Sequence, residues 1–195
     1  MSTPDRRTQL IDAAITLIAQ RGLRALTHRA LDAALDLPAG STSYYFRTKA
    51  ALIDAVVTRI TLRSRADFQA AVASGPAPTD LADAAHGIAV WLDQLLTERR
   101  DQLIARHALI IDLLDDDEIT AKLTASLFSV ERARELFSAM EVSDPATAAA
   151  DFLALLEGAV FDRFAGRRRE LTAGSADSVR QLERLLRTYF AGTPT

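Results

Sequence analysis

The chain has 195 residues and a formal net charge of −3; 49% of its residues are hydrophobic and 25% are charged. This length fits one domain or two small ones, and this balance is typical of a chain that buries an apolar core. The absence of cysteine excludes disulfides, thiolate metal sites and cysteine nucleophiles. No apolar run approaches the ~18 residues of a membrane span, and no signal-peptide core is present, so we expect a cytoplasmic protein without membrane contact.

The positive charge of the chain is concentrated at its start. Residues 1–65 hold ten Lys or Arg against five Asp or Glu, a net charge of +5, whereas residues 66–195 hold thirteen against twenty-one, a net charge of −8. A small basic module on an otherwise acidic protein favours contact with a polyanion through that module alone. Chance clustering of charge is the alternative at this size.

Apolar spacing predicts helices throughout the chain. Alanine and leucine supply 63 of the 195 residues, and apolar side chains recur every three or four positions rather than every two. We find no convincing strand pattern. The sequence therefore predicts an all-α fold of about nine helices.

Capping and turn residues divide the N-terminal part into three helices. Gly22 suits the left-handed position after the end of a first helix. Thr27 suits the start of a second helix, because its hydroxyl can accept from amides of the first turn. Pro38 suits the first position of a third helix, which we expect over residues 38–45, since its missing N–H has no partner there.

Six further helices follow. The features that mark them are, in order, Thr48, Thr79, the apolar residues 103–114, the acidic residues 115–118, Pro145 and residues 174–175. The first of the six reaches Ser74 and extends over ~35 Å at ~1.5 Å per residue. It is long enough to join two domains.

The last two helices form the expected dimer surface. The eighth is apolar around most of its circumference and needs cover on more than one side, and the ninth has the three-four-three apolar spacing that pairs helices in bundles. The residues of this predicted interface are Phe152, Leu156, Val160, Val179, Leu182, Leu186 and Tyr189.

The third helix indicates contact with DNA. Residues 40–43 are poor helix formers, and Tyr44 and Tyr45 stand where a purely structural helix would use alanine or leucine. Two short helices joined by a tight turn, the second with small and hydroxyl-bearing residues, are typical of a helix-turn-helix that enters the major groove. An ordinary helical hairpin with a polar face is the alternative, and the basic charge of the segment counts against it.

Residues 10–57 carry an ordered set of motifs. These are residues 10–14 (Leu-Ile-Asp-Ala-Ala), Gly22, Leu26-Thr27, Arg29-Ala30-Leu31 and residues 45–52 (Tyr-Phe-Arg-Thr-Lys-Ala-Ala-Leu). In this region the sequence resembles the N-terminal part of TetR-family transcriptional regulators. Ser43 and Thr42 depart from the family pattern, which commonly has a tyrosine and an aliphatic residue at these positions.

The resemblance implies a homodimeric repressor in three parts: a helix-turn-helix domain over residues 1–48, a connecting helix over residues 49–74, and a ligand-binding and dimerisation domain over residues 75–195. It also implies a double-stranded DNA operator and a small-molecule inducer as partners. The residues predicted to contact DNA are Thr27, His28, Arg29, Ala39, Gly40, Ser41, Ser43, Tyr44, Tyr45 and Lys49.

Polar residues set among apolar ones in the C-terminal part indicate a small-molecule pocket with a few orienting groups. The residues of this predicted pocket are Trp91, Arg106, His107, Ile110, Phe128, Glu157 and Phe161. Each of them alone also has a structural explanation. His107, for example, fits a core histidine that bonds within its own bundle.

Other chemistry finds little support. The three histidines lack the spacing of a helical zinc site, and the acidic residues 115–118 suit a helix N-terminus. Hydrolase and phosphate-loop motifs are missing. We therefore expect no catalytic residue, no metal and no cofactor; the alternative function is a helical interaction protein or a bundle enzyme with an incidental basic hairpin.

Overall fold

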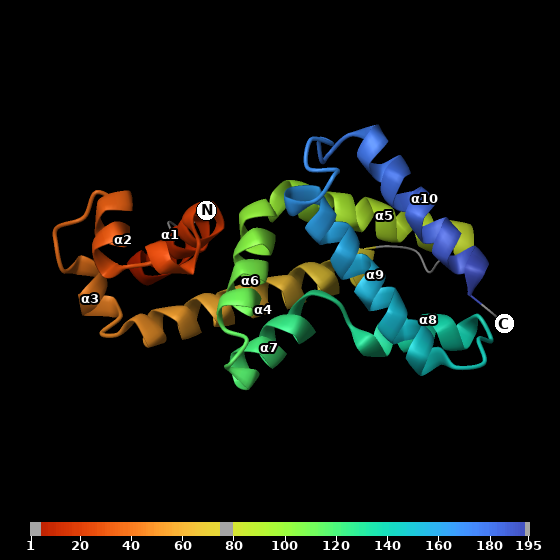
Figure 1. The fold of residues 1–195 in the computed structure, drawn as a ribbon, viewed down its shortest axis with the longest axis horizontal. Helices are drawn as coiled ribbons and strands as arrows, with labels where there is room; N and C mark the ends of the chain where they lie inside the picture. Colours follow the sequence, from red (N-terminus) through yellow and green to blue (C-terminus); the bar gives the residue numbers. More distant parts are fainter. Residues whose placement is uncertain (1–4, 75–79, 194–195) are drawn as a thin grey trace. The chain divides into compact units, whose positions relative to one another are not determined.

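The computed structural model describes residues 5–74 and 80–193, and for residues 72–74 it describes the backbone alone. All regular structure in these ranges is helical (Figure 1), which confirms the predicted all-α fold. The elements are α1 (Arg6–Arg21), the 3₁₀ turn η1 (Leu23–Ala25), α2 (His28–Ala34), α3 (Ser41–Tyr45), α4 (Lys49–Ser74), α5 (Leu81–Glu98), α6 (Arg100–Asp112), α7 (Asp117–Leu127), α8 (Val130–Ala139), α9 (Pro145–Ala165) and α10 (Ala176–Gly192).

The chain packs into two compact units. The first holds the described residues up to Asp67 together with Asp101–Leu127, and the second holds Phe68–Arg100 together with the described residues from Phe128 onward. Packing therefore divides the chain differently from the functional division at residues 48 and 74 expected from sequence. That functional division stays a prediction.

Local capping explains most helix boundaries. α1 ends at Gly22, whose φ of 76° is left-handed. The Thr27 hydroxyl accepts from the amide of Ala30 at 3.1 Å and caps α2. Thr79 lies outside the described residues; α5 is capped by Asp80, whose carboxylate accepts from the amide of Asp83 at 2.8 Å.

One helix was not expected from the sequence. Ser129 interrupts the region between the acidic start of α7 and Pro145, and its hydroxyl accepts from the amide of Arg132 at 3.2 Å. This cap starts α8, so the described residues form ten α-helices where about nine were predicted. Serine is an ordinary surface residue as well as a cap, which is why the sequence pattern did not reveal the break.

The core of the first unit joins the N-terminal helices to the middle of the chain. Leu10 of α1, Leu31 of α2 and Val56 of α4 are fully buried in one cluster. Leu109 of α6 and Leu123 of α7 belong to the same cluster. The three N-terminal helices are therefore not packed alone, because α6 and α7 complete their core.

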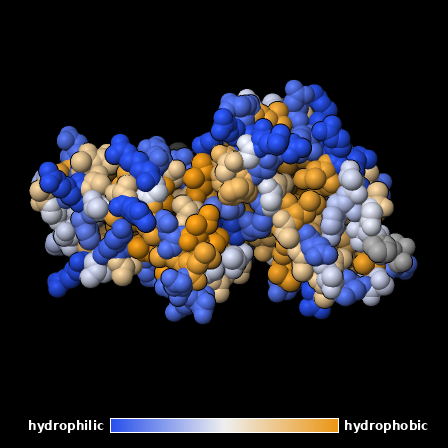
Figure 2. Space-filling model, viewed as in Figure 1, coloured by the Kyte–Doolittle hydropathy of each residue, from blue (hydrophilic) through white to orange (hydrophobic). Residues whose placement is uncertain are grey.

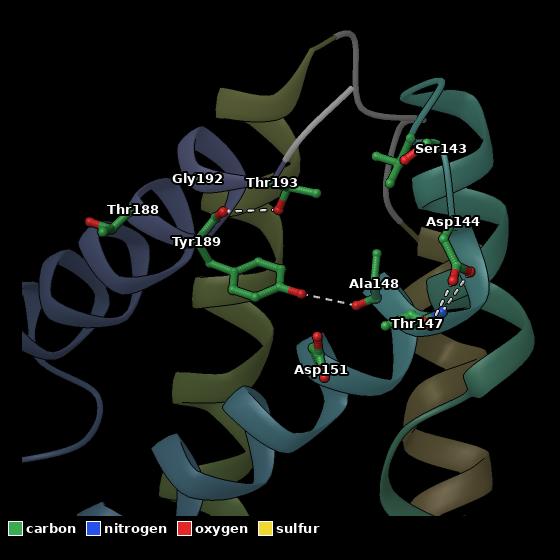
Figure 3. Close-up of a pocket in the computed structure, with 10 residues that line it drawn as sticks. Ser143, Asp144, Thr147, Ala148, Asp151, Thr188, Tyr189, Gly192 and Thr193 are labelled. Carbon is green, nitrogen blue, oxygen red and sulfur yellow. Dashed lines mark hydrogen bonds between the residues drawn. The ribbon is translucent and has the colours of Figure 1, made fainter.

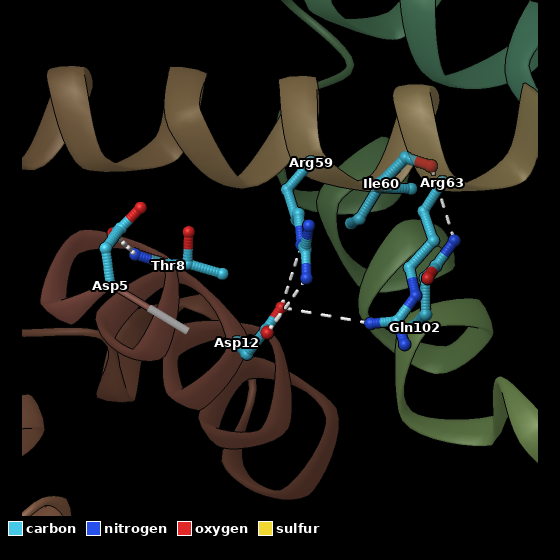
Figure 4. A network of polar contacts seen from close by, with 7 residues as sticks. All are labelled: Asp5, Thr8, Asp12, Arg59, Ile60, Arg63 and Gln102. Atoms are coloured by element: carbon cyan, nitrogen blue, oxygen red, sulfur yellow. Dashed lines mark hydrogen bonds and ion pairs between the residues drawn. The ribbon is translucent and has the colours of Figure 1, made fainter. Parts of the chain in front are cut away.

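Polar contacts join the long helix α4 to α1 and to α6 (Figure 4). Asp12 of α1 pairs with Arg59 through two bonds of 3.0 Å, and Arg63 lies 3.9 Å from the same carboxylate. From α6, the buried amide of Gln102 donates to the Ile60 carbonyl at 3.3 Å and to the Ser64 hydroxyl at 3.0 Å. The Asp12 pair is partly exposed and contributes only about 0–1 kcal/mol, so the buried apolar residues of α1 and α4 hold the two helices together more than this pair does.

In the second unit, α10 packs along α5 and α8 packs along α9. The rings of Phe152 and Phe190 stack at 5.4 Å between centroids, and Phe137 lies edge-on to Phe152 at 5.5 Å. Asp93 of α5 is buried and accepts from the hydroxyl of Ser178 and from the amide of Gly174. An aromatic cluster and a buried carboxylate thus fasten α10 to the other helices of this unit.

We expect Leu156→Ala to lower the free energy of unfolding by about 2–5 kcal/mol, because Leu156 is 3% exposed within a single chain and its loss leaves a cavity. Urea unfolding followed by circular dichroism measures the change. Leu81→Ala is the matched control, since Leu81 is 40% exposed and should cost less than about 1 kcal/mol. Equal losses for the two variants would contradict the described core.

Candidate DNA-binding site

A buried carboxylate joins the two short helices that the sequence analysis marked. Asp32 of α2 is 5% exposed. One of its oxygens accepts from the amide of Gly40 at 2.8 Å. The other accepts from the amide of Thr42 at 2.8 Å and from the Thr42 hydroxyl at 2.6 Å. One side chain therefore caps α3 and fixes its position against α2.

These bonds keep Asp32 charged. The hydrogen bond from the Thr42 hydroxyl is the main reason that the pKa of Asp32 lies below its ordinary value of 3.8, and the amides of Thr42 and Gly40 add to the effect. Burial acts in the opposite direction and is outweighed. At neutral pH Asp32 is a carboxylate, the form that accepts all three bonds.

The start of α3 differs from the expectation. The predicted third helix covered residues 38–45, but α3 begins at Ser41 because Gly40 adopts a left-handed conformation with φ of 91°. A Cβ at Gly40 would meet no atom within 4 Å, so the backbone conformation rather than lack of space requires glycine. The left-handed turn points the Gly40 amide at Asp32.

The far end of α3 is also tied to the preceding helices. The Nε2 atom of His28 lies 2.7 Å from the carbonyl of Phe46, and since a carbonyl only accepts, Nε2 carries the proton and donates. The guanidinium of Arg7 lies 5.1 Å from the centroid of the Phe46 ring. Lys49 donates to the carbonyl of Leu23 at 3.1 Å. Both ends of α3 are thus anchored.

Between these anchors, α3 presents aromatic and hydroxyl groups to solvent. Tyr44 is 83% exposed, Tyr45 is 40% exposed, and their rings meet edge-on at 5.2 Å. Ser43 is exposed beside them, while Thr42 points inward to Asp32. The other predicted contacts with solvent exposure are Thr27, Arg29, Ala39, Gly40 and Lys49.

Besides Thr27, whose hydroxyl caps α2, and Gly40, whose amide bonds Asp32, three further predicted DNA contacts have partners within the chain. The Ser41 hydroxyl donates to the Pro38 carbonyl at 2.6 Å, which leaves its oxygen as an acceptor. His28 and Lys49 hold backbone carbonyls, as described above, although the ammonium of Lys49 keeps two further donors. Their contact with DNA stays a prediction, and each has a structural role that the sequence did not reveal.

The predicted ligand residues fall into both units. In the first unit, buried Arg106 donates through Nε to the Leu123 carbonyl at 2.8 Å, and His107 holds the Leu103 carbonyl at 2.8 Å through Nδ1. Ile110 is half-buried in this unit's core. In the second unit, Trp91 and Phe128 meet edge-on at 5.9 Å, and Glu157 and Phe161 lie on α9. Trp91 and Phe128 therefore form a contacting pair within the second unit.

A hollow of about 480 Å³ opens in the second unit between the start of α9 and the end of α10 (Figure 3). Tyr189 borders it and donates to the Ala148 carbonyl at 3.0 Å. Burial and the nearby Asp151 raise the pKa of Tyr189. None of the predicted ligand residues lines this hollow, which the sequence analysis did not anticipate.

The predicted dimer residues are mostly core residues of one chain. Those buried are Phe152, Leu156, Val160, Leu182 and Leu186. Val179 is half-buried, and so is Tyr189, which packs on the ring of Phe152. These side chains already have partners within the chain, and their contact with a second copy stays a prediction. The sequence pattern predicted that α9 is apolar around most of its circumference but not which of its faces the chain covers.

The open face of α9 carries small and apolar residues instead. They are spaced four, four, three and four positions apart and are exposed: Ala150, Ala154, Gly158, Phe161 and Ala165. On the face drawn in Figure 2, hydrophobic residues gather in several places among hydrophilic ones. We call these five residues the α9 stripe.

Other kinds of site are not supported within the described ranges. No helix there has the length and apolar character needed to cross a bilayer. No group of three or more His, Cys, Asp or Glu in the same ranges is placed to hold a metal ion.

Two short helices with a fixed angle, an exposed second helix and basic flanks define a helix-turn-helix DNA-binding protein. The model of the family "Bacterial regulatory proteins, tetR family" matches residues 10–56, and the model "Tetracyclin repressor-like, C-terminal domain" matches residues 77–192. The chain belongs to the TetR family and is a DNA-binding transcriptional regulator. This outcome favours the regulator over the interaction protein or bundle enzyme.

Individual relatives agree with this assignment. The chain is 42% identical over 52 residues to the HTH-type transcriptional repressor KstR2 of Rhodococcus jostii (strain RHA1), a match that spans 27% of this chain and only 26% of that protein. A TetR-family structure from Streptomyces coelicolor A3 is 27% identical with a TM-score of 0.65, covering 93% of this chain and 98% of that one. The multidrug binding protein EbrR complexed with ethidium is 26% identical with a TM-score of 0.59, covering 93% and 98%.

We expect Asp32→Asn to lower the free energy of unfolding by about 1–3 kcal/mol at neutral pH, because the amide cannot accept all three bonds in place of the carboxylate. The pKa of Asp32 is lowered by folding, so its contribution is present above the unfolded value of 3.8 and is lost as the pH falls through the lower native value. Wild type and variant should therefore converge in stability at acid pH. Urea unfolding over a pH series measures this, and a constant difference at every pH would contradict it.

Proposed function

We propose that this regulator is a homodimeric repressor that binds a palindromic operator with two copies of α3 and leaves it when a small molecule binds the C-terminal helices. The main support for the proposal is that hydrogen bonds to Asp32 fix α3 in the free protein while its outer face is exposed to solvent. This face can therefore enter the major groove without a change in the orientation of the helix. The similarity to the repressor KstR2 in the N-terminal region supports repression. The proposed role needs no enzymatic activity and places the protein in the cytoplasm with the DNA.

The chemistry of the side chains separates the proposed DNA contacts into those with phosphates and those with base edges. Arg29 and Lys49 are exposed cations, and with Thr27 at the start of α2 they suit phosphate oxygens. Tyr44 and Ser43 lie on the exposed face of α3 and suit base edges. The small residues Ala39, Gly40 and Ser41 allow close approach, and His28 and Tyr45 border that surface.

The dimer is proposed to form through the α9 stripe. An exposed apolar face at helical spacing is a common feature of interfaces, and small residues let two helices approach closely. A Cβ added at Gly158 meets no atom within 4 Å, so packing within one chain does not require glycine at this position. A two-fold dimer would place its two α3 helices ~34–36 Å apart, or a multiple of that, on one face of the operator.

The inducer is proposed to bind in the second unit beside Trp91 and Phe128. Arg106 and His107 are occupied with chain carbonyls, so we expect them to shape the fold more than to contact a ligand. EbrR, which is similar over most of the chain, is a multidrug binding protein crystallised with ethidium, and this supports a pocket for an aromatic molecule. Bound ligand should then lower the affinity for the operator, and bound operator should lower the affinity for the ligand by the same factor.

The direct test is a binding titration with duplexes from the DNA that flanks the protein's own gene. We expect a palindromic duplex to be preferred over its scrambled version, with affinity falling steeply as salt rises. Equal affinity for both duplexes at every salt concentration would leave only non-specific binding and contradict the proposal.

Substitutions should separate phosphate contacts from base contacts. Lys49→Ala is expected to weaken all duplexes to a similar extent and to reduce the slope of log affinity against log salt by about 1. Tyr44→Ala is expected instead to change the preference among duplexes by about 1–3 kcal/mol for each lost base contact. Arg169→Ala, an exposed cation of the second unit, is the control and should change neither quantity. Unchanged binding by the Lys49 variant would show that Lys49 does not contact DNA.

We expect Gly158→Arg to produce a folded monomer. The arginine has room within the chain and raises helix propensity by about 0.5–1 kcal/mol, but it puts a charge into the proposed interface. Gly87→Arg is the matched control, because Gly87 is also an exposed helical glycine with no atom within 4 Å of an added Cβ. Sedimentation should show a monomer for the first variant and a dimer for the control. A dimeric Gly158 variant, or a monomeric wild type at micromolar concentration, would contradict the proposed interface.

A further inference from the structure

The indole N–H of Trp91 is a buried donor to which no described residue offers an acceptor. Trp91 lies on α5, its ring is half-buried, and its Nε1 atom has no contact with solvent. An unpaired buried donor destabilises a protein, because it has lost its hydrogen bond to water without gaining another. Because buried polar groups are nearly always paired, this donor points to an acceptor that the described part of the chain does not hold, such as one on a bound molecule.

Two phenyl rings stand against this indole. Phe68 lies 5.8 Å from the Trp91 ring at an interplanar angle of 72°, and Phe128 lies 5.9 Å away at 70°. An aromatic face is at best a weak acceptor for an N–H group, so these neighbours do not replace a hydrogen bond. They do form an aromatic wall that suits a flat, largely apolar molecule.

Both phenylalanines stand where the chain passes from one packed unit to the other. Phe68 is the first residue of the second unit on α4, and Phe128 is the first residue of that unit after α7. Because Nε1 is closed to solvent, a molecule that reaches the Trp91 donor must displace some of the atoms that cover it, and the two phenyl rings lie against the same indole. A displacement of either ring acts on the chain where it leaves the unit that contains α3.

We propose that Trp91 recognises the effector: an aromatic molecule with a carbonyl or ring-nitrogen acceptor takes a hydrogen bond from Nε1 and lies in place of the Phe68 or Phe128 ring. This inference rests on the proposed ligand-released function. It adds the chemical class of the ligand and the side chain that selects it. Aromatic molecules without an acceptor would leave the donor unpaired and bind more weakly.

The test uses the full-length protein labelled with ¹⁵N in its indole, because Trp91 is the one tryptophan of the sequence and gives a single indole resonance. Two probes of similar shape are compared, 2-acetylnaphthalene, which has an acceptor, and 2-isopropylnaphthalene, which does not. We expect the acetyl probe to shift the N–H proton downfield in a saturable titration. We expect the isopropyl probe to give no downfield shift.

Affinities measured by calorimetry provide the second readout. Trp91→Phe keeps the aromatic ring and removes the donor, so it should bind the acetyl probe roughly threefold to tenfold more weakly and the isopropyl probe as wild type does. Tyr189→Phe is the matched control, since it removes from the same unit an aromatic donor that already bonds the Ala148 carbonyl. It should keep wild-type affinity for both probes.

The outcomes separate this inference from the proposed function. An acetyl probe that fails to bind, binds without a downfield shift, or binds Trp91→Phe as tightly as wild type would overturn the inference, whatever the protein does on DNA. A probe that shifts the resonance and loses affinity for Trp91→Phe supports the inference. If such a probe leaves the affinity for the operator unchanged, the result contradicts the proposal that a ligand releases the protein from DNA, while recognition of the ligand by Trp91 is still supported.

Discussion

The three hydrogen bonds that Asp32 accepts determine what the N-terminal region can present to DNA. They join residues eight and ten positions apart, cap α3 and keep the carboxylate charged. With Gly40 left-handed on one side and Phe46 held by His28 on the other, a helix of five residues has a fixed orientation. A helix this short is not stable alone. Its order is established by folding, so DNA binding need not supply it.

The same constraint extends into the core of the first unit. Leu109 of α6 and Leu123 of α7 are buried with the apolar residues of α1 and α2, and Gln102 holds the backbone of α4. The helix α3 therefore belongs to a packed unit that is larger than the three N-terminal helices. The chain passes from one unit to the other beside Phe68 and beside Phe128, and both of these residues lie against Trp91.

What the sequence predicted well was local. The end of α1 at Gly22 and the cap at Thr27 follow from the chemistry of single residues, and both are confirmed. What it missed depends on contacts between distant residues. Thr42 departed from the family pattern without an evident reason, and the reason is its bond to Asp32. Periodicity likewise identified α9 as apolar, but which face lies inside was decided by packing against α8, so the predicted dimer residue Leu156 is a core residue.

The central claim is that α3 is held in its DNA-binding orientation by Asp32 before DNA is present. Hydrogen exchange of the backbone amides in the free protein tests it most directly. The account predicts that the amides of Gly40 and Thr42 are protected to a degree similar to that of Leu31 in α2, because all three donate within the same folded body. Exchange of Gly40 and Thr42 as fast as that of an unstructured chain, with Leu31 still protected, would contradict it.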